Sequence, residues 1–300
     1  MKKFVLKVLL FFTCVVVMDF AFGRFFSYMR AHAKGGSTAN CEYIANRCQD
    51  DIIILGSSRA THHYVPQIIE DSLGMSCYNC GEEGNGIVLA YGRFKQIVSR
   101  HRPNLVVYEV TPGYDYSYLE PDVKYLGYLK PYYGQSFIRD IVNDFGGSLI
   151  SIKMLSKMYQ NSDRLLPNLV DNIILRDNFK GYEPLYGLKS TPIQLQKDTK
   201  ISMWDSHKLQ YLERLISDAG KYGIPICFVV SPRCEQGNDM TQFSPAISLC
   251  NKYNVPFINL KNCKGIFDQP SLFQDDYHLN NDGAVQYSSL FVEEIKRILE

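Results

Sequence analysis

Residues 49–64 read QDDIIILGSSRATHHY, and this stretch decides the fold. Residues 52–55 form a short, continuous and largely β-branched run, which predicts a central strand buried on both faces rather than a helix. The chain must then turn at Gly56 and present residues 57–59 at the carboxyl end of that strand. In an open parallel sheet, ligands bind at this edge.

The same strand-then-helix pattern repeats along the chain. After the first strand, Pro66 opens a helix over residues 67–73. Further strands are predicted at 75–79, 105–110, 224–230 and 256–260, and further helices at 87–99, 204–222, 242–253 and 284–299, the last capped by Asn281 or Asp282. Short apolar strands alternating with helices indicate an α/β fold, in which helices cover both faces of a parallel sheet of about five strands.

Length, composition and net charge exclude some classes of function. The chain has 300 residues, 46% of them hydrophobic, and a net charge of +1. This length can bury one sizeable core, and so small a net charge creates no strong field for attracting nucleic acid. We therefore expect one globular domain with an attachment, and no nucleic-acid partner.

The attachment is the N-terminal segment. Basic residues precede an unbroken apolar run over 8–18, and apolar residues resume through Phe22 after Asp19. About 20 apolar residues span a bilayer, so the favoured interpretation is an uncleaved, single-pass anchor in the inner membrane, with the globular part extracytoplasmic or periplasmic. A cleaved signal peptide ending near residues 31–33 and a buried helix are the alternatives. The predicted division is 1–34 for the anchor and juxtamembrane segment and 35–300 for the globular domain.

The cysteines suggest neither a metal nor a redox cofactor. Cys41 and Cys48 lie in a polar segment where a disulfide is one possibility, whereas buried free thiols are expected in the apolar runs. Cys77 and Cys80 have the spacing of a redox motif but open no evident helix. We expect no cofactor.

Residues 114–203, approximately, interrupt the α/β pattern. The segment opens with many tyrosines and continues into helical stretches around 138–159 and 165–175. It is interpreted as a helical insertion after the third strand, and two roles remain open for its tyrosines. They either pack as a core or form an aromatic platform for sugar rings or another flat substrate.

Chemistry-bearing residues follow each predicted strand. Asp275-Asp276-Tyr277-His278 lies between the fifth strand and the last helix, and an aspartate three residues before a histidine can hold its ring within one turn. The other residues that follow strands and reach the same edge are Ser58, Gly84, Gly113, Ser231 and Arg233. A serine, a histidine and an aspartate converging at one edge favour acyl transfer through a serine nucleophile.

Three stretches resemble the first, second and fifth motif blocks of the SGNH/GDSL hydrolases: residues 54–58 (ILGSS), 79–84 (NCGEEG) and 275–278 (DDYH). The resemblance covers residues 50–113 and 223–299. It implies a flavodoxin-like, three-layer fold, with Ser58 as the nucleophile and with Ser57 in place of the usual aspartate, as in membrane-anchored relatives that modify cell-envelope polymers.

By the same resemblance His278 is the base, Asp275 is its orienter, and the N–H groups of Ser58 and Gly84 line the oxyanion hole. The third block normally supplies an asparagine, which residues 109–114 (EVTPGY) lack. The Gly113 N–H is a candidate replacement.

The sequence is compatible with three functions. The first is an anchored serine esterase that removes acyl groups, such as acetyl, from an extracytoplasmic glycan or lipid. The second is an O-acyltransferase that acts on a cell-surface polysaccharide through the same triad, and the third is a non-catalytic glycan-binding protein on the same scaffold. The candidate substrate-binding residues are Arg59, Tyr114, Tyr116 and Arg233.

Overall fold

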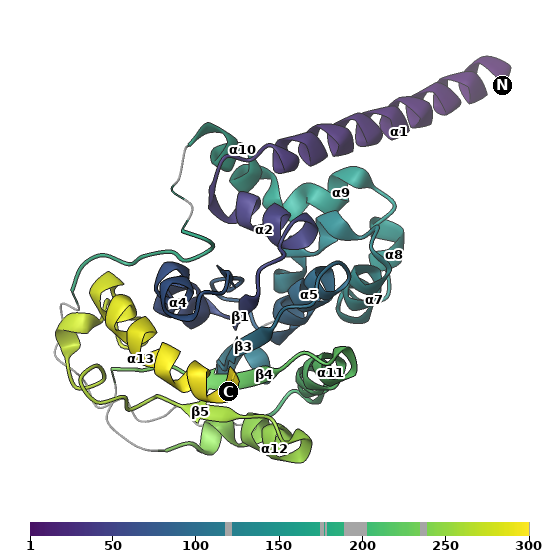
Figure 1. The fold of residues 1–300 in the computed structure, drawn as a ribbon. Coiled ribbons are helices and arrows are strands. Elements are labelled where there is room, and N and C mark those ends of the chain that lie inside the picture. The colour runs from purple at the N-terminus through teal and green to yellow at the C-terminus, as the bar shows by residue number, and fades with distance from the viewer. Residues whose placement is uncertain (118–121, 175–176, 178, 189–202, 235–238, 300) are drawn as a thin grey trace. The chain divides into compact units, whose positions relative to one another are not determined.

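The computed structural model describes residues 1–117, 122–174, 177, 179–188, 203–234 and 239–299 (Figure 1). The chain divides into two compact units. Unit 1 comprises Met1–Ala45 and Asp122–Asp177, and unit 2 comprises Asn46–Pro121 and Asn178–Glu300.

Unit 2 contains a five-stranded parallel sheet in the order β2-β1-β3-β4-β5. The strands are β1 (Ile52–Gly56), β2 (Cys77–Asn79), β3 (Leu105–Glu109), β4 (Ile226–Val230) and β5 (Phe257–Asn259). The register pairs Ile52 with both Cys77 and Leu105, which places β1 between two partners. The predicted fold class is confirmed, and each strand lies within its predicted range or, for β1, one residue beyond it.

Helices flank the sheet on both faces (Figure 1). On one side are α3 (Ser58–His63), α4 (Pro66–Leu73) and α13 (Asn281–Leu299), and on the other are α5 (Ile87–Val98), α11 (Ser206–Tyr222) and α12 (Ser244–Tyr253). The short elements of unit 2 are α6 (Pro112–Asp115), η4 (Thr241–Phe243) and η5 (Pro270–Leu272). This is the three-layer α/β/α arrangement expected from alternating strands and helices.

Alternate residues of the strands build the core beneath α13. Ile52 and Ile54 join Tyr287 and Phe291 of α13 in one buried cluster. All five residues of β1 are buried, as a strand covered on both faces requires.

One helix was not predicted, and the start and cap of the last helix need correction. The sequence pattern did not predict α3, whose first residue is Ser58. Helix α13 begins three residues before the predicted start at residue 284, and its cap is Asn280 rather than Asn281 or Asp282, because the Asn280 Oδ1 accepts the Gly283 N–H at 3.0 Å.

Unit 1 is helical. Its elements are α1 (Lys2–Ala31), α2 (Gly36–Asn46), η1 (Asp122–Tyr128), η2 (Lys130–Tyr132), α7 (Ser136–Phe145), α8 (Ile150–Lys153), α9 (Lys157–Asn161), η3 (Ser162–Arg164) and α10 (Leu165–Ile173). Among the described residues, α1 alone is long and apolar enough to cross a membrane, with a mean hydropathy of 2.3 over its best 18 residues. Its length and composition are those of a membrane anchor and equally those of a signal sequence.

The disulfide considered for Cys41 and Cys48 is not formed, since all nine cysteines are free thiols. Of the tyrosines in the insertion, Tyr116 is buried in unit 2, and Tyr125 and Tyr132 are buried in unit 1. These three therefore pack as core residues rather than forming an aromatic platform. Tyr118 lies outside the described residues.

Candidate active site

A tight turn places Ser58 at the carboxyl end of β1. Gly56 has φ of +146°, and a Cβ at this position would lie 2.8 Å from the Glu109 backbone oxygen, so the turn requires glycine. Ser57 is the N-cap residue of α3, and Ser58 opens the helix. The Ser57 Oγ is buried and has no hydrogen-bond partner in the described part of the chain, whereas the Ser58 side chain is half-buried.

Ser58, His278 and Asp275 form one hydrogen-bonded chain. The Ser58 Oγ lies 2.7 Å from His278 Nε2, and the His278 Nδ1 lies 2.8 Å from Asp275 Oδ2. An ionised carboxylate only accepts hydrogen bonds, so we assign the ring proton to Nδ1. Nε2 is then the acceptor for the Ser58 hydroxyl.

Backbone contacts shape the turn that carries His278. The Asp275 Oδ1 accepts the backbone N–H groups of Tyr277 and His278 at 2.7 and 2.8 Å. Partial burial alone would raise the pKa of Asp275, but the bonds from the His278 ring and from these N–H groups outweigh it and hold the pKa below its ordinary value. Asp275 is therefore ionised at neutral pH.

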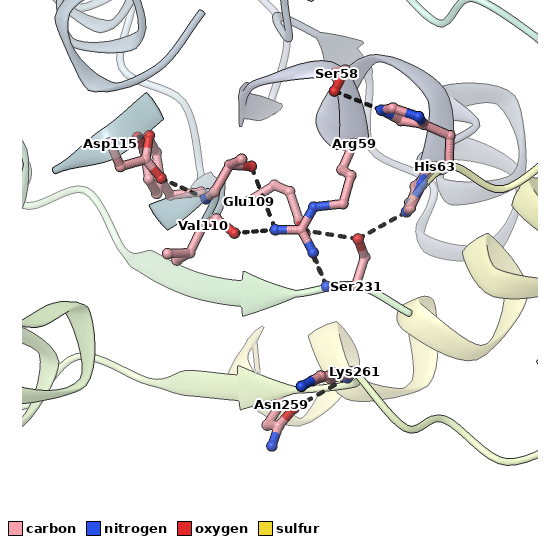
Figure 2. Close-up of polar contacts among 12 residues, drawn as sticks. Ser58, Arg59, His63, Glu109, Val110, Asp115, Ser231, Asn259 and Lys261 are labelled. Atoms are coloured by element: carbon pink, nitrogen blue, oxygen red, sulfur yellow. Dashed lines mark hydrogen bonds and ion pairs between the residues drawn. The ribbon is translucent and has the colours of Figure 1, made fainter. Parts of the chain in front are cut away.

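A buried network lies beneath Ser58 and centres on Glu109 (Figure 2). The Ser231 Oγ donates to Glu109 Oε1 at 2.9 Å, and Arg59 Nη2 lies 3.3 Å from the same oxygen. The Tyr64 hydroxyl also donates to Glu109, and Arg59 donates to the Val110 carbonyl. The side chains of Glu109 and Arg59 are almost fully buried. The network thus ties α3 to the ends of β3 and β4.

His63 extends this network to the turn of His278. The backbone N–H of Leu279 donates to His63 Nε2 at 3.0 Å, and His63 Nδ1 lies 2.8 Å from Ser231 Oγ. Since Nε2 accepts, Nδ1 carries the proton and donates to Ser231. Complete burial lowers the pKa of His63 well below its ordinary value, and repulsion from the His278 ring, when that ring is protonated, and from the Arg59 guanidinium lowers it further. His63 is therefore neutral.

Burial raises the pKa of Glu109, while Arg59, Tyr64 and Ser231 counter that effect. The donors that converge on the carboxylate are those an ionised glutamate requires, so the geometry favours the Arg59–Glu109 ion pair.

Arg93 holds the loop that carries Gly84 in place. This buried guanidinium donates to the Cys80 and Gly81 carbonyls at 2.8 and 2.9 Å and pairs with Glu82. Gly84 has φ of +64°. A Cβ at Gly81 would lie 2.6 Å from the Thr61 nitrogen, so glycine allows the loop to pack closely on α3.

The remaining predicted site residues are distributed unevenly. Tyr116 is fully buried, and its hydroxyl donates to the Gln242 carbonyl, while Arg59 is buried in the Glu109 network. Gly113 and Tyr114 are partly exposed at the carboxyl end of β3. The Arg233 guanidinium lies 4.9 Å from the centre of the Tyr277 ring. Tyr277 directly precedes His278 in the sequence. Only Arg233, Gly113 and Tyr114 of this group have partly exposed surface.

Sequence reasoning gave no positioning role to Glu109, His63 or Arg93. The available signals were a charged residue inside the apolar run 105–110 and the spacing of four between Arg59 and His63, which puts both on one side of a helix.

No group of three metal-ligating side chains occurs in the described ranges. A hollow lined by Ile216, Tyr253 and Ile298 lies at the amino ends of β4 and β5, at the opposite edge of the sheet from Ser58, and is not part of the site.

No protein-family model and no curated protein sequence matches the chain. Solved structures that are similar include an acetyl xylan esterase, with a TM-score of 0.41 and 12% identity over 83% of this chain and 100% of that chain. A protein of the G-D-S-L lipolytic family from Desulfitobacterium hafniense matches with a TM-score of 0.41 and 9% identity over 81% and 98%. A protein described as a platelet activating factor from Streptococcus pneumonia matches with a TM-score of 0.45 and 11% identity over 98% and 99%.

Proposed function

We propose that the chain is a serine hydrolase of the SGNH/GDSL type that cleaves acyl esters with Ser58, His278 and Asp275. The observation that carries the proposal is the continuous hydrogen-bonded chain from Ser58 Oγ through His278 to Asp275. Its members come from α3 and from the turn before α13, so the fold itself brings them together. This is the arrangement that activates a serine nucleophile.

In the proposed mechanism, the Ser58 Oγ attacks the ester carbonyl carbon while His278 Nε2 takes the hydroxyl proton. The Asp275 carboxylate stabilises the imidazolium that forms. When the tetrahedral intermediate collapses, the carbon–oxygen bond to the alcohol breaks, and His278 returns the proton to the departing oxygen. Water, deprotonated by His278, then attacks the acyl carbon. The bond from that carbon to Ser58 Oγ breaks, the acyl group leaves as an acid, and His278 returns the proton to Ser58 Oγ.

The oxyanion formed during attack needs N–H donors. Ser58 opens α3, and the first N–H groups of a helix have no acceptor within it, so the Ser58 N–H is available. Gly84 is the second proposed donor, and the Gly113 N–H, in the first turn of α6, is the third. Losing one such donor typically costs about a hundred- to a thousand-fold in rate, so two donors still leave a working catalyst.

The proposed substrate is a glycan or another envelope polymer that carries acyl esters, such as acetyl esters. Arg233 and Tyr277 offer a cation and a partly exposed ring beside His278, where a sugar ring could dock. The proposed location is the inner membrane, crossed once by α1, with unit 2 in the periplasm. Protease digestion of spheroplasts tests this location, and full protection of unit 2 would refute it.

Two assays test the chemistry. A fluorophosphonate probe should label the wild type and the Ser57→Ala variant but not Ser58→Ala, and labelling that survives Ser58→Ala would refute the assignment. Hydrolysis of a chromogenic acetate ester, with and without an added oligosaccharide, identifies the reaction. Acetate release alone indicates an esterase, and acetylation of the sugar indicates an O-acyltransferase. Neither product, together with measurable glycan affinity, indicates a binding protein.

A further inference from the structure

In helix α10 of unit 1, the polar side is buried and the apolar side is exposed. Its polar residues Asn168 and Asp171 are buried, at 1% and 3% exposure, whereas its apolar residues Leu166 and Ile173 are 74% and 79% exposed. Leu169 and Val170 are partly exposed on the same helix. A helix on the surface of a water-soluble domain shows the opposite arrangement, with its apolar stripe toward the core.

The orientation of α10 is fixed by its polar side. The Asp171 Oδ2 accepts the Thr38 N–H at 3.0 Å, and the Asn168 Oδ1 accepts the Thr38 hydroxyl at 3.1 Å. The Asp171 carbonyl also accepts the Lys34 N–H at 3.1 Å. Turning the apolar face inward would leave these buried polar groups without partners, which is costly. The hydrogen bonds of the polar side therefore keep the apolar residues of α10 facing outward.

The outward face belongs to the same packed unit as α1. The Asn172 side chain donates to the Met29 carbonyl of α1 at 2.9 Å, and Arg30 donates to Asn161 of α9 at 2.9 Å. Nearer the amino end of α1, Asp19 accepts hydrogen bonds from the Ser156 hydroxyl and the Lys157 N–H at 2.5 and 2.7 Å. The carboxyl-terminal half of α1 is thus joined to α9 and α10, and the contact at Asp19 directly follows the unbroken apolar run over residues 8–18.

We propose that α10 lies in the boundary between lipid headgroups and acyl chains beside α1, with Leu166, Leu169, Val170 and Ile173 in contact with lipid. An amphipathic helix whose apolar face enters this boundary has the surface that α10 presents. The occupant is lipid because the face is part of the unit whose first helix carries the apolar segment. The inference rests on the membrane-anchoring role proposed for α1.

The test places single tryptophans in the full chain, reconstituted in phosphatidylcholine vesicles. Trp204→Phe removes the lone native tryptophan. Leu166→Trp and Ile173→Trp, made separately, report on α10, and both positions are open enough to accept the larger ring. Val16→Trp in α1 is the control for the anchor, and Leu290→Trp on the exposed side of α13 is the control for a surface in water.

Quenching by a lipid carrying a nitroxide near the headgroup end of its acyl chain is then measured. We expect both α10 reporters to be quenched severalfold more than Leu290→Trp and to emit at shorter wavelength. If Val16→Trp is quenched while both α10 reporters match Leu290→Trp, the proposal is overturned and the anchor stands. Blue-shifted α10 emission without lipid quenching would assign the face to protein contact, and it also overturns the proposal. If Val16→Trp is not quenched, the anchor fails as well.

Discussion

The Asp275–His278 pair and the Glu109 network are both charged hydrogen-bonded systems beside Ser58, but they differ in burial. Asp275 is half-exposed and its partner ring partly so, whereas Glu109 is fully enclosed with Arg59, Ser231 and Tyr64. Groups open to substrate can carry out chemistry, and enclosed groups fix the position of that chemistry. Changes in the pair should therefore remove activity with little loss of stability, and changes in the network should mainly reduce stability.

The largest expected effect is that of His278→Ala on turnover. Without its ring the Ser58 hydroxyl has no base, and turnover should fall by about a millionfold, the scale known for single triad deletions in a serine protease. Ester hydrolysis measures the loss, and thermal unfolding should remain close to that of the wild type. Undiminished activity in His278→Ala would exclude the proposed triad.

Asp275→Asn should lower turnover by up to roughly ten-thousand-fold, because the amide favours the wrong ring tautomer and cannot stabilise the imidazolium. Its oxygen can still accept the backbone N–H groups of Tyr277 and His278, so the turn should persist. Asp276→Asn is the matched control and should have a far smaller effect. KM should change little in both variants, and equal losses of turnover would contradict the assignment of Asp275.

Glu109→Gln should reduce the free energy of unfolding by about 3–5 kcal/mol, because it leaves the Arg59 guanidinium buried without its counter-charge. Chemical unfolding in detergent solution measures the change. Glu213→Gln, which breaks a pair with the exposed Lys252, is the surface control and should cost at most about 1 kcal/mol.

A double variant separates the pair from the rest of the network. Arg59→Met combined with Glu109→Gln removes the unpaired charge and should recover part of the stability lost in Glu109→Gln alone. A double variant that is no more stable than Glu109→Gln alone would show that the unpaired Arg59 charge is not the source of the loss.

Ser231→Ala should cost about 1–3 kcal/mol of unfolding free energy, since it removes the hydroxyl between His63 and Glu109 and leaves buried polar groups unmatched. Ser289→Ala removes an exposed hydroxyl that donates to the Val285 carbonyl one turn earlier in α13, and should change the unfolding free energy by less than about 0.5 kcal/mol. Equal costs for the two variants would contradict the buried role of Ser231.

The smallest expected effect is the contribution of Asp275 to stability. Its folded pKa lies below the unfolded value, so its stabilisation is fully present above about pH 3.9 and is lost as the pH falls through the folded pKa. Because Asp275 is half-exposed, solvent screening should keep this contribution below about 1 kcal/mol. Unfolding of the wild type and Asp275→Asn is compared from pH 7 downward. A wild-type advantage that grows on acidification would reverse the sign.

The strand pattern was sufficient to predict the edge at which the site forms. The runs 52–55, 105–110 and 224–230 each contain a strand of the parallel sheet, and parallel topology brings their carboxyl ends together. Asp275 and His278 were recognisable as a local pair because three residues can bridge one turn. Their contact with Ser58, 220 positions away, followed from placement at the same edge.

Other features had no local signal strong enough to predict them. Arg59 was a candidate for substrate binding, yet it is buried against Glu109, and Tyr116 is enclosed instead of facing a substrate. Arg93 was not singled out in the sequence, but it holds the loop before Gly84. Each of these outcomes depends on which distant residue lies opposite, and sequence spacing does not encode that.

The sequence by itself determined the alternation of the five strands with the longer helices beside them, the apolar N-terminal segment and the residue types at the sheet edge, because periodicity and turn chemistry act over a few neighbouring residues. Tertiary structure alone decided that Glu109 would gather Arg59, Ser231 and Tyr64, and that α10 would turn its polar side inward. Those outcomes arise because a buried polar group must find partners wherever the packed chain supplies them, and these partners lie 45 to 133 positions away.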